Sequence, residues 1–334
     1  MLAGSVRVMH AIEIVNLDGP EAVQFSEVPT PEPGEGQVLI RVRAAGVSFP
    51  ELLQTRGQYQ FKPDMPFTPG SEVAGDVVTA PEGSGFEPGD RVAAMVMLGG
   101  FAEYAVAPAD QTFALPDELS YAQGAALPLN YLTAHFALVT RAHLAPGEVV
   151  LVHGAAGGVG TAAIQTAKAF GAGRVIAVAS TEEKRAIALA AGADDAVPAD
   201  GFLPAVKELD GFEGVDIVVD PVGGDRFTDS LRSLRTHGRV LVIGFTDDGQ
   251  IPEVKVNRLL LNNTSVLGVG WGHYALSRPG FIRHQFEELR PHIESGVIKP
   301  PIGSEFALAD AGRALSLMDG RGALGKIVLT PGAS

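Results

Sequence analysis

One stretch decides the fold of this chain: Val149-Val-Leu-Val-His-Gly-Ala-Ala-Gly-Gly-Val-Gly160, which runs directly into the alanine-rich segment Thr161 to Phe170. An apolar, β-branched run stops at a cluster of glycines, and a helix-forming segment begins at once. This order is typical of a strand, a tight turn and a helix whose N-terminus binds the pyrophosphate of a dinucleotide. The N–H groups that open such a helix have no partner within it, and glycines let a phosphate approach them closely.

The glycine pattern is a variant of Gly-x-Gly-x-x-Gly, with Ala155, Gly157 and Gly160 at its three positions and an extra glycine at Gly158. A second strand, expected over Arg174 to Ser180, follows where a dinucleotide-binding unit requires it. An ordinary loop of an α/β protein is the alternative. We predict that the turn contacts the cofactor through Ala155, Ala156, Gly157, Gly158 and Val159.

Length and composition are typical of a globular enzyme of two domains. The chain has 334 residues, of which 46% are hydrophobic and 19% charged, and this balance excludes a disordered chain. No apolar run approaches the ~18 residues that a membrane span needs, and the first residues are too polar for a secretory signal. A net charge of −14 argues against nucleic-acid and membrane partners. With 0 Cys there can be no disulfide, and we expect a cytoplasmic protein.

The two parts of the chain differ in their predicted secondary structure. The first third has short β-prone runs between Pro- and Gly-rich turns, which predicts a small barrel-like domain. From about Leu127 helices alternate with buried strands, which predicts a parallel sheet covered by helices on both faces. Three dipeptides are expected to end helices, namely Phe170-Gly171, Ala191-Gly192 and His237-Gly238. The parallel strands are expected at Val149–His153, Val175–Ala179, Ala196–Val197, Val215–Asp220, Val240–Phe245 and Ser265–Val269.

The segment after Trp271 is too small to fold alone, with two helices and a final strand over Lys326 to Thr330. We therefore expect it to return to the first domain, which makes that domain discontinuous. The predicted division is residues 1–126 with 272–334 for the discontinuous domain, and residues 127–271 for the dinucleotide-binding domain.

Several ordered motifs resemble the medium-chain dehydrogenase/reductase superfamily, and within it the zinc-independent NADPH:quinone oxidoreductase (zeta-crystallin-like) branch. The resemblance implies an α/β fold with a GroES-like β-barrel domain and a Rossmann domain, and a homodimer paired through the strand Ser265 to Val269. The family usually begins at a strand that here starts at Met9, so we expect Met1 to Val8 to be either an extension or the result of a start codon placed too early. The motifs are Ala45-Gly-Val-Ser-Phe-Pro-Glu51, Pro66-Phe-Thr-Pro-Gly-Ser-Glu-Val-Ala-Gly75, Pro88-Gly-Asp-Arg-Val92, Gly100-Phe-Ala-Glu-Tyr104, the dinucleotide turn, Gly268-Val-Gly-Trp271 and Gly325-Lys-Ile-Val-Leu329.

The residues argue against a catalytic metal. Zinc enzymes of the superfamily use cysteines and a Gly-His-Glu motif, whereas this chain has Gly70-Ser71-Glu72 and no cysteine. None of the 8 His forms a convincing set of metal ligands, and His153 is interpreted as a structural residue beneath the glycine turn. Without a Lewis acid an alkoxide is poorly stabilised, so we expect reduction of an electrophilic substrate and not alcohol oxidation.

The end of the second strand favours NADPH over NADH. Sites selective for NAD place a carboxylate about 20 residues after the turn, and here that position is Ser180, followed closely by Lys184. The resemblance likewise assigns Ser180, Lys184 and Arg321 to the cofactor. Alternatively, Ser180 and Glu183 form a capping box, Lys184 and Arg185 form a solvated helix face, and Arg321 is a surface residue. A tyrosine that relatives often place near the phosphate is Ala199 here.

The nicotinamide is expected at the carboxyl ends of the strands. From the second domain we expect it to contact Thr133, at the opening of a helix over Tyr131 to Leu138, and the residues Gly244, Phe245, Gly270 and Trp271. From the first domain, Tyr59 is the predicted donor to the substrate oxygen, with a packing role as the alternative. Ser48 is the second predicted catalytic residue, and it replaces an asparagine that is usual in relatives.

Together these features predict an enzyme that transfers hydride from NADPH to a quinone or a similar conjugated carbonyl. The closest alternative is an NADPH-dependent reductase of 2-alkenals or 2-enoyl thioesters, since the hydride chemistry is the same. Arg56 and Lys62 are the only basic residues between Gln54 and Lys62, and so few favour a small neutral substrate over a CoA thioester. A low-turnover, redox-sensing NADPH-binding protein is the third possibility, suggested by the altered Ser48.

Overall fold

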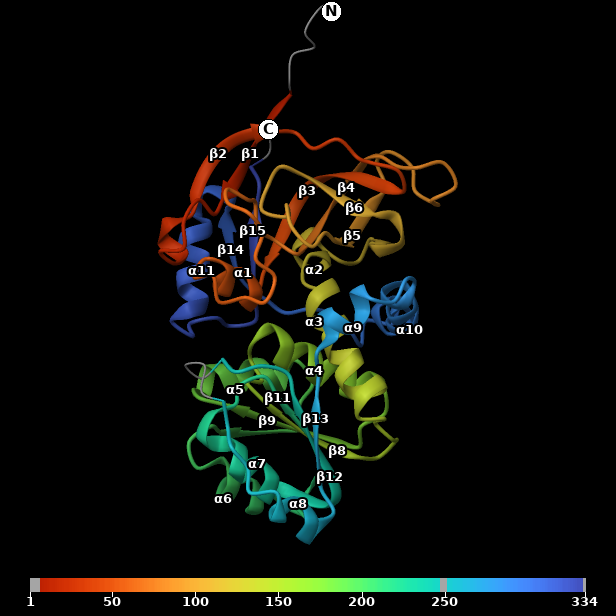
Figure 1. Cartoon of the computed structure of the whole chain (residues 1–334). Coiled ribbons are helices and arrows are strands. Elements are labelled where there is room, and N and C mark those ends of the chain that lie inside the picture. The colour runs from red at the N-terminus through yellow and green to blue at the C-terminus, as the bar shows by residue number, and fades with distance from the viewer. Residues whose placement is uncertain (1–6, 247–250, 333–334) are drawn as a thin grey trace, which may run out of the picture. The chain divides into compact units, whose positions relative to one another are not determined.

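The computed structural model describes residues 7–246 and 251–332, so most of the predicted extension (residues 1–6) lies outside the described residues. The chain forms two compact units. One consists of Met1–Leu129 and Pro300–Ser334, and the other of Asn130–Lys299. Figure 1 shows the elements of each unit, which are described separately below.

The first unit is built on a largely antiparallel sheet in the order β14-β15-β3-β4-β5-β7, with β6 paired to β3. Strand β3 explains how this sheet covers a core, because Val38, Ile40 and Val42 alternate with more exposed neighbours and are each at most 3% exposed. A separate hairpin joins β1 and β2. The strands are β1 (Val8–Glu13), β2 (Gln24–Pro29), β3 (Gln37–Val47), β4 (Glu72–Thr79), β5 (Arg91–Met95), β6 (Tyr104–Pro108), β7 (Thr112–Ala114), β14 (Ile302–Ala307) and β15 (Lys326–Thr330).

Three helices of the first unit are used below: α1 (Phe49–Gln54), α2 (Tyr121–Gly124) and α11 (Ala311–Asp319). Helix α1 starts directly after β3, and α11 packs its Ala311, Ala314 and Leu315 into the main core of this unit. The returning chain thus supplies both a helix and the strands β14 and β15.

The second unit contains a six-stranded parallel sheet in the order β10-β9-β8-β11-β12-β13. Numbered along the chain, this order is 3-2-1-4-5-6, that of a dinucleotide-binding doubly wound sheet, with the reversal between β8 and β11. The predicted parallel sheet is therefore confirmed. Its strands are β8 (Val149–His153), β9 (Arg174–Ala179), β10 (Asp195–Pro198), β11 (Val215–Asp220), β12 (Leu234–Val242) and β13 (Ser265–Gly268).

Helices flank this sheet, and Figure 1 shows α4 and α5 on one side of the strands and α7 and α8 on the other. One predicted helix end is wrong: α7 stops at Ser233, and His237-Gly238 lies inside β12, where His237 has a φ of 67°. The helices are α3 (Pro128–His135), α4 (Gly158–Ala169), α5 (Glu182–Ala190), α6 (Phe202–Lys207), α7 (Phe227–Ser233), α8 (Asn257–Asn262), α9 (Trp271–Leu276) and α10 (Phe281–Glu294).

The second unit continues to Lys299, beyond the expected boundary at residue 271. The reason is visible in the packing of its last helices. Phe136, Tyr274 and Phe281 form a cluster of three ring contacts with centroids 4.9 to 6.1 Å apart, which joins the segment after α3 to α9 and α10. Within the described residues, no helix combines the length and apolar character needed to cross a membrane.

Candidate functional site

The segment from Gly154 to Gly160 forms a tight turn between β8 and α4. After β8, Gly154 has a φ of +58°, and its carbonyl oxygen accepts the N–H of Gly157 at 2.9 Å. A Cβ at Gly160 would lie 2.2 Å from that same carbonyl oxygen, so only glycine fits there. Helix α4 then begins after Gly157 with no side-chain cap. The first amides of α4 therefore remain available to an anionic ligand.

Two buried polar residues hold the strand ends beneath this turn. His153, which ends β8, is 2% exposed, and its Nε2 lies 2.9 Å from Ser230 Oγ. Burial lowers the pKa of His153 to about 4, so the imidazole is neutral near pH 7. Asp220, which ends β11, accepts the N–H groups of Val222 and Gly223, both at 2.9 Å. These contacts fit the structural role predicted for His153.

The end of β9 presents a polar group that the helix cap does not use. Thr181, not Ser180, is the N-cap of α5, and its Oγ1 accepts the N–H of Lys184 at 3.2 Å. The alternative capping box of Ser180 and Glu183 is therefore wrong, and Ser180 is exposed directly after the strand. Lys184 lies within the first turn of α5.

Arg185 also reaches the end of β9, which the sequence did not reveal. Its Nη1 is 3.4 Å from the carbonyl oxygen of Ala179, and that oxygen also accepts the N–H of Ala199 at 3.1 Å. Arg185 is only partly exposed, so it is not the fully solvated residue that the alternative interpretation assumed. Ser180, Arg185 and Ala199 thus meet at one strand end.

The ends of β12 and β13 carry the residues expected beside the nicotinamide. A Cβ at Gly270 would meet no atom within 4 Å, and one at Gly244 would meet only Pro221 O, at 3.4 Å. The Gly270 backbone therefore borders open space, and a Cβ at Gly244 would make one ordinary van der Waals contact. Trp271 opens α9 and is 6% exposed.

Thr133 is 9% exposed and lies within α3. The expected start of this helix is wrong, because α3 begins at Pro128. Phe245 follows Gly244 in the segment after β12.

The first unit contains a buried polar cluster around the predicted catalytic residue Ser48. Lys326 donates to Ser48 Oγ at 2.6 Å and to Glu72 Oε1 at 2.5 Å. Ser48 Oγ in turn donates to Glu72 Oε1 at 3.2 Å, and Glu72 Oε2 accepts the N–H of Leu129 at 2.8 Å. Glu72 and Lys326 are 0% and 3% exposed. The Ser48 hydroxyl is therefore engaged both as donor and as acceptor.

Glu51 is a second carboxyl group in this cluster. It lies on α1 and is 0% exposed. Its carboxyl group accepts a hydrogen bond from Ser71 Oγ at 2.5 Å and another from the N–H of Ser48 at 2.9 Å. Burial raises the pKa of Glu51 to about 7, against the opposing effects of the Ser71 hydrogen bond and of the Lys326 charge. Burial and then the charge of Glu51 raise the pKa of Tyr59, so this phenol stays protonated and can donate a hydrogen bond.

The residues around Glu72 do not fit a zinc ion. The Glu72 carboxylate already binds the Lys326 ammonium and a backbone N–H, and its neighbours Ser48 and Ser71 are hydroxyls. Across residues 7–246 and 251–332 there is no group of three or more His, Cys, Asp or Glu placed to hold a metal. Zinc prefers thiolate, imidazole and carboxylate ligands in a tetrahedral set.

The predicted site residues divide between the two units. Ser48, Tyr59 and Arg321 belong to the first unit, and all others to the second. Arg321 lies in the turn after α11 with a φ of 56°, and its N–H bonds to Met318 O at 3.0 Å.

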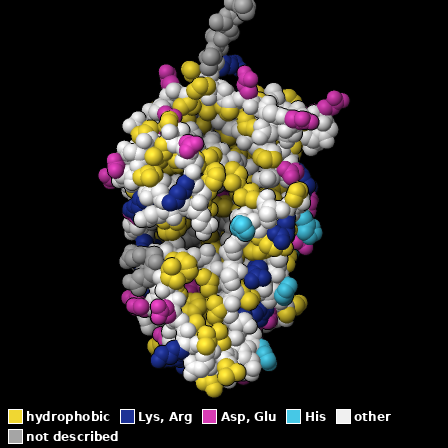
Figure 2. All heavy atoms as spheres, viewed as in Figure 1, with side chains coloured by type: hydrophobic (Ala, Val, Ile, Leu, Met, Phe, Trp, Pro, Cys, Tyr) yellow, Lys and Arg dark blue, Asp and Glu magenta, His cyan; other side chains and the backbone are white. Residues whose placement is uncertain are grey.

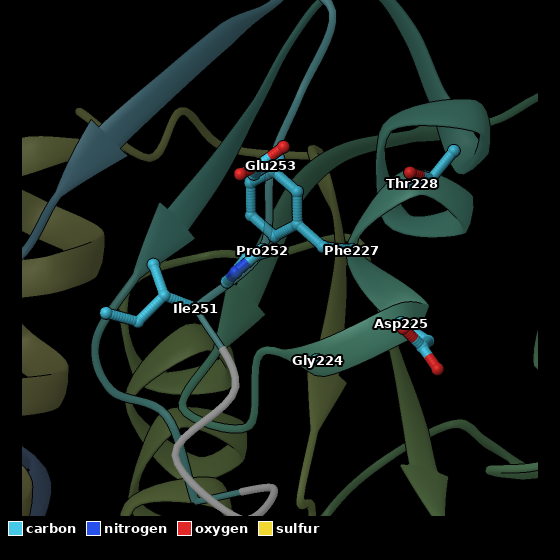
Figure 3. Close-up of a pocket in the computed structure, with 7 residues that line it drawn as sticks. All are labelled: Gly224, Asp225, Phe227, Thr228, Ile251, Pro252 and Glu253. Atoms are coloured by element: carbon cyan, nitrogen blue, oxygen red, sulfur yellow. The ribbon is translucent and has the colours of Figure 1, made fainter.

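A separate pocket of about 170 Å³ in the second unit contains none of the predicted residues (Figure 3). Its two charged lining residues, Asp225 and Glu253, are acidic and do not suit a phosphate. It is lined by Gly224, Asp225, Phe227, Thr228, Ile251, Pro252 and Glu253. Figure 2 shows that basic side chains are dispersed among acidic ones on the face drawn, without a continuous basic patch.

Comparison with known families places both parts of the chain. Residues 34–117 match the profile described as alcohol dehydrogenase GroES-like domain. Residues 158–295 match the profile described as zinc-binding dehydrogenase. With the parallel sheet of the second unit, these matches confirm the predicted combination of a GroES-like domain and a Rossmann domain.

Individual relatives cover nearly the whole chain. The quinone oxidoreductase of Rattus norvegicus is 36% identical over 98% of this chain and 99% of its own. A probable oxidoreductase from Mycobacterium abscessus has a solved structure with a TM-score of 0.88 and 41% identity, covering 98% of this chain and 100% of that one. The quinone oxidoreductase of Thermus thermophilus, solved also in complex with NADPH, has a TM-score of 0.82 and 36% identity, covering 96% and 100%.

Proposed function

This chain belongs to the quinone oxidoreductase family of the medium-chain dehydrogenases/reductases, and from that premise we propose that it transfers hydride from NADPH to a quinone or a similar conjugated carbonyl, without zinc. The observation that carries the proposal is the turn from Gly154 to Gly160. Gly160 lies too close to the Gly154 carbonyl oxygen for any side chain, and helix α4 starts without a side-chain cap. The Thermus relative was solved with NADPH. Five residues of the turn, Ala155 to Val159, would hold the pyrophosphate.

The end of β9 supports NADPH rather than NADH. Ser180 stands where NAD-selective sites carry a carboxylate, and it lies outside the cap of α5. A hydroxyl accommodates a 2′-phosphate, whereas a carboxylate would repel it. We therefore assign Ser180 and Lys184 to the 2′-phosphate and propose Arg321 as a further basic contact. The exposed Glu182 and Glu183 lie one and two residues after the cap, within the first turn of α5.

We propose that the reaction uses no metal as a Lewis acid, because the polar groups around Glu72 are already bonded to one another. The Glu72 carboxylate is held by Lys326 and by the N–H of Leu129, and no thiolate exists in a chain with 0 Cys. A quinone suits such a site, because the oxyanion formed by hydride addition is delocalised and needs little further stabilisation. Catalysis then consists mainly of positioning the reactants and excluding water.

When bound, NADPH supplies a hydride from its nicotinamide ring. In the proposed mechanism, Thr133, Gly244, Phe245, Gly270 and Trp271 position that ring. Tyr59 donates a hydrogen bond to the substrate oxygen, because its raised pKa keeps the phenol protonated at neutral pH. The proton that completes the reduction comes from Tyr59, which solvent then reprotonates, or directly from water. For Ser48 we propose a positioning role within this cluster, since its hydroxyl donates to Glu72, accepts from Lys326 and faces the backbone N–H of Glu51 in a capping box.

The engaged Ser48 hydroxyl also keeps two alternatives open. An NADPH-dependent reductase of 2-alkenals or 2-enoyl compounds would use the same cofactor site with a different pocket. A low-turnover redox-sensing protein would bind NADPH tightly and reduce no acceptor. Substrate turnover distinguishes all three.

We further propose that the protein is a cytoplasmic homodimer. Strand β13 is the edge of the parallel sheet and pairs only with β12 among the described strands. Next to it in sequence, Val256, Leu260 and Leu261 on or beside α8 are 74 to 76% exposed, and yellow side chains gather in Figure 2 where Figure 1 places α8. Pairing of two β13 edges would cover such a surface. A light-scattering mass equal to one chain would exclude the dimer.

The test of the proposed function is NADPH oxidation by the purified protein against quinones, 2-alkenals and one enoyl thioester, with NADH in parallel. Turnover of quinones with NADPH supports the proposal. Turnover of alkenes alone retains the cofactor and replaces the substrate. Tight NADPH binding without turnover favours the redox-sensing alternative, and preference for NADH contradicts the assignment of Ser180.

A further inference from the structure

A fully buried glutamine joins three helices beside the predicted nicotinamide site. Gln285 on α10 is 0% exposed and makes three side-chain hydrogen bonds. Its Oε1 accepts the indole N–H of Trp271 at 2.8 Å. Its Nε2 lies 3.1 Å from the carbonyl oxygen of Leu132 and 3.1 Å from Nδ1 of His135, both on α3. No sequence pattern reveals this residue, because it is separated by 150 positions or more from its partners on α3.

The donors and acceptors in this network determine its protonation. The indole N–H can only donate, so Gln285 must present its oxygen to Trp271 and its two N–H groups to α3. His135 Nδ1 must then be the unprotonated, accepting nitrogen. Its other nitrogen, Nε2, then carries the proton and lies 3.1 Å from Glu288 Oε2, without the geometry of a hydrogen bond. Burial and the nearby His284 lower the pKa of His135 to about 4, so this arrangement persists at neutral pH.

We infer that Gln285 is a positioning residue of the cofactor site, whose amide holds the Trp271 indole and the adjoining Gly270 against the part of α3 that carries Thr133. The inference rests on the proposed function, which places Gly270, Trp271 and Thr133 around the nicotinamide. Gln285 is 0% exposed and does not reach a ligand directly, so it acts through Trp271. The geometry supports a fixed corner, because all three partners are within 3.1 Å and Trp271 is itself buried.

Trp271 makes this inference directly measurable, because the chain has 1 Trp. NADPH absorbs where tryptophan emits, so NADPH bound beside Trp271 quenches its fluorescence by energy transfer. The variant Gln285→Leu removes all three hydrogen bonds, because it replaces the amide with an apolar side chain of similar size. We expect it to raise KM for NADPH about tenfold, to leave KM for the acceptor within about twofold, and to reduce the quenching at saturating NADPH.

Gln165→Leu is the matched control. Gln165 is also a buried glutamine of the second unit, 7% exposed, and it makes three bonds: to the Tyr131 hydroxyl at 2.7 Å and to the backbone N and O of Lys299, both at 2.9 Å. We expect Gln165→Leu to lower Tm to a similar extent and to leave KM for NADPH and the quenching unchanged. Equal effects of the two variants on KM and quenching would overturn the inference.

A second variant covers the case in which Gln285→Leu does not fold. Trp271→Phe removes the indole N–H, and in the inference it should raise KM for NADPH as Gln285→Leu does. Gln285→Glu keeps an acceptor for the Trp271 indole and loses the donors to α3. It should therefore raise KM for NADPH less than Gln285→Leu does. An unchanged KM in both variants overturns the inference. If the wild-type protein shows neither quenching nor NADPH oxidation, the proposed function itself fails, and this outcome is separate from the variants.

Discussion

Replacing Glu51 with glutamine should abolish one part of the pH dependence of folding stability. Glu51 is fully buried, and its carboxyl accepts from Ser71 Oγ and from the N–H of Ser48. In Glu51→Gln, the amide oxygen can still accept from Ser48, and the amide N–H can donate to Ser71, whose hydroxyl then acts as acceptor. The substitution therefore removes a titrating proton without removing a packing contact or leaving a partner unsatisfied.

The magnitude follows from the difference in pKa between the folded and unfolded states. The pKa of Glu51 rises from 4.5 to about 7 on folding, so between these values the folded state holds a proton that the unfolded state has lost. The wild-type free energy of unfolding must then fall as pH rises from about 4.5 to 7. Each pH unit is worth about 1.4 kcal/mol, so the total is about 3 kcal/mol. Glu51→Gln should lack this fall.

Urea unfolding at pH 5 and at pH 8 measures the effect. We expect the variant to gain about 3 kcal/mol relative to the wild type on going from pH 5 to pH 8, because other titrating groups are shared and cancel in the comparison. Glu118→Gln, at an exposed position, is the control and should leave the pH dependence unchanged. If the free energy of unfolding changed equally with pH in the wild type and in Glu51→Gln, the argument that burial raises the pKa of Glu51 would be refuted.

Three further predictions concern the proposed chemistry. Gly160→Ala should abolish detectable NADPH quenching, because its Cβ would lie 2.2 Å from the Gly154 carbonyl oxygen; unchanged binding would show that the turn is not the pyrophosphate site. Ser180→Asp should lower the ratio of kcat/KM for NADPH over NADH by about 100-fold, through repulsion of the 2′-phosphate, and an unchanged ratio would place that phosphate elsewhere. Tyr59→Phe should lower kcat about tenfold or more with an unchanged Kd for NADPH; an unaffected kcat would leave the phenol a packing role.

The Rossmann sheet could be predicted because its signals are local in the chain. β-branched runs end at glycines, and the strands β8 and β11 have the predicted bounds, Val149–His153 and Val215–Asp220. Errors arose where two local signals compete. Ser180 and Thr181 are adjacent hydroxyl residues before a helix, and the pattern alone could not decide which of them caps it. At His237 a glycine after a polar residue resembled a helix end but lies inside β12.

The buried cluster of the first unit could not be predicted, because its members are brought together by the fold. Lys326 is 254 positions from Glu72 and 278 from Ser48, yet it bonds to both. Taken one at a time, Lys326 reads as the start of a strand and Glu51 as an exposed helix residue. Only the sheet contact between β15 and β3 places the lysine beside the start of α1. Pairing across such distances leaves no periodicity in the sequence.

The contacts of this cluster explain why Glu51 holds its proton more tightly than a free carboxyl group does. Two buried carboxyl groups share one buried ammonium, so ionisation of both would leave an uncompensated negative charge away from water. Glu72 bonds directly to Lys326, whereas Glu51 is bonded to two neutral donors and feels the lysine only at longer range. Burial therefore keeps a proton on Glu51 until the pH rises to about 7. Burial and then the charge of ionised Glu51 raise the pKa of Tyr59. Loss of the Glu51 proton above about pH 7 therefore makes the proposed donor a weaker acid.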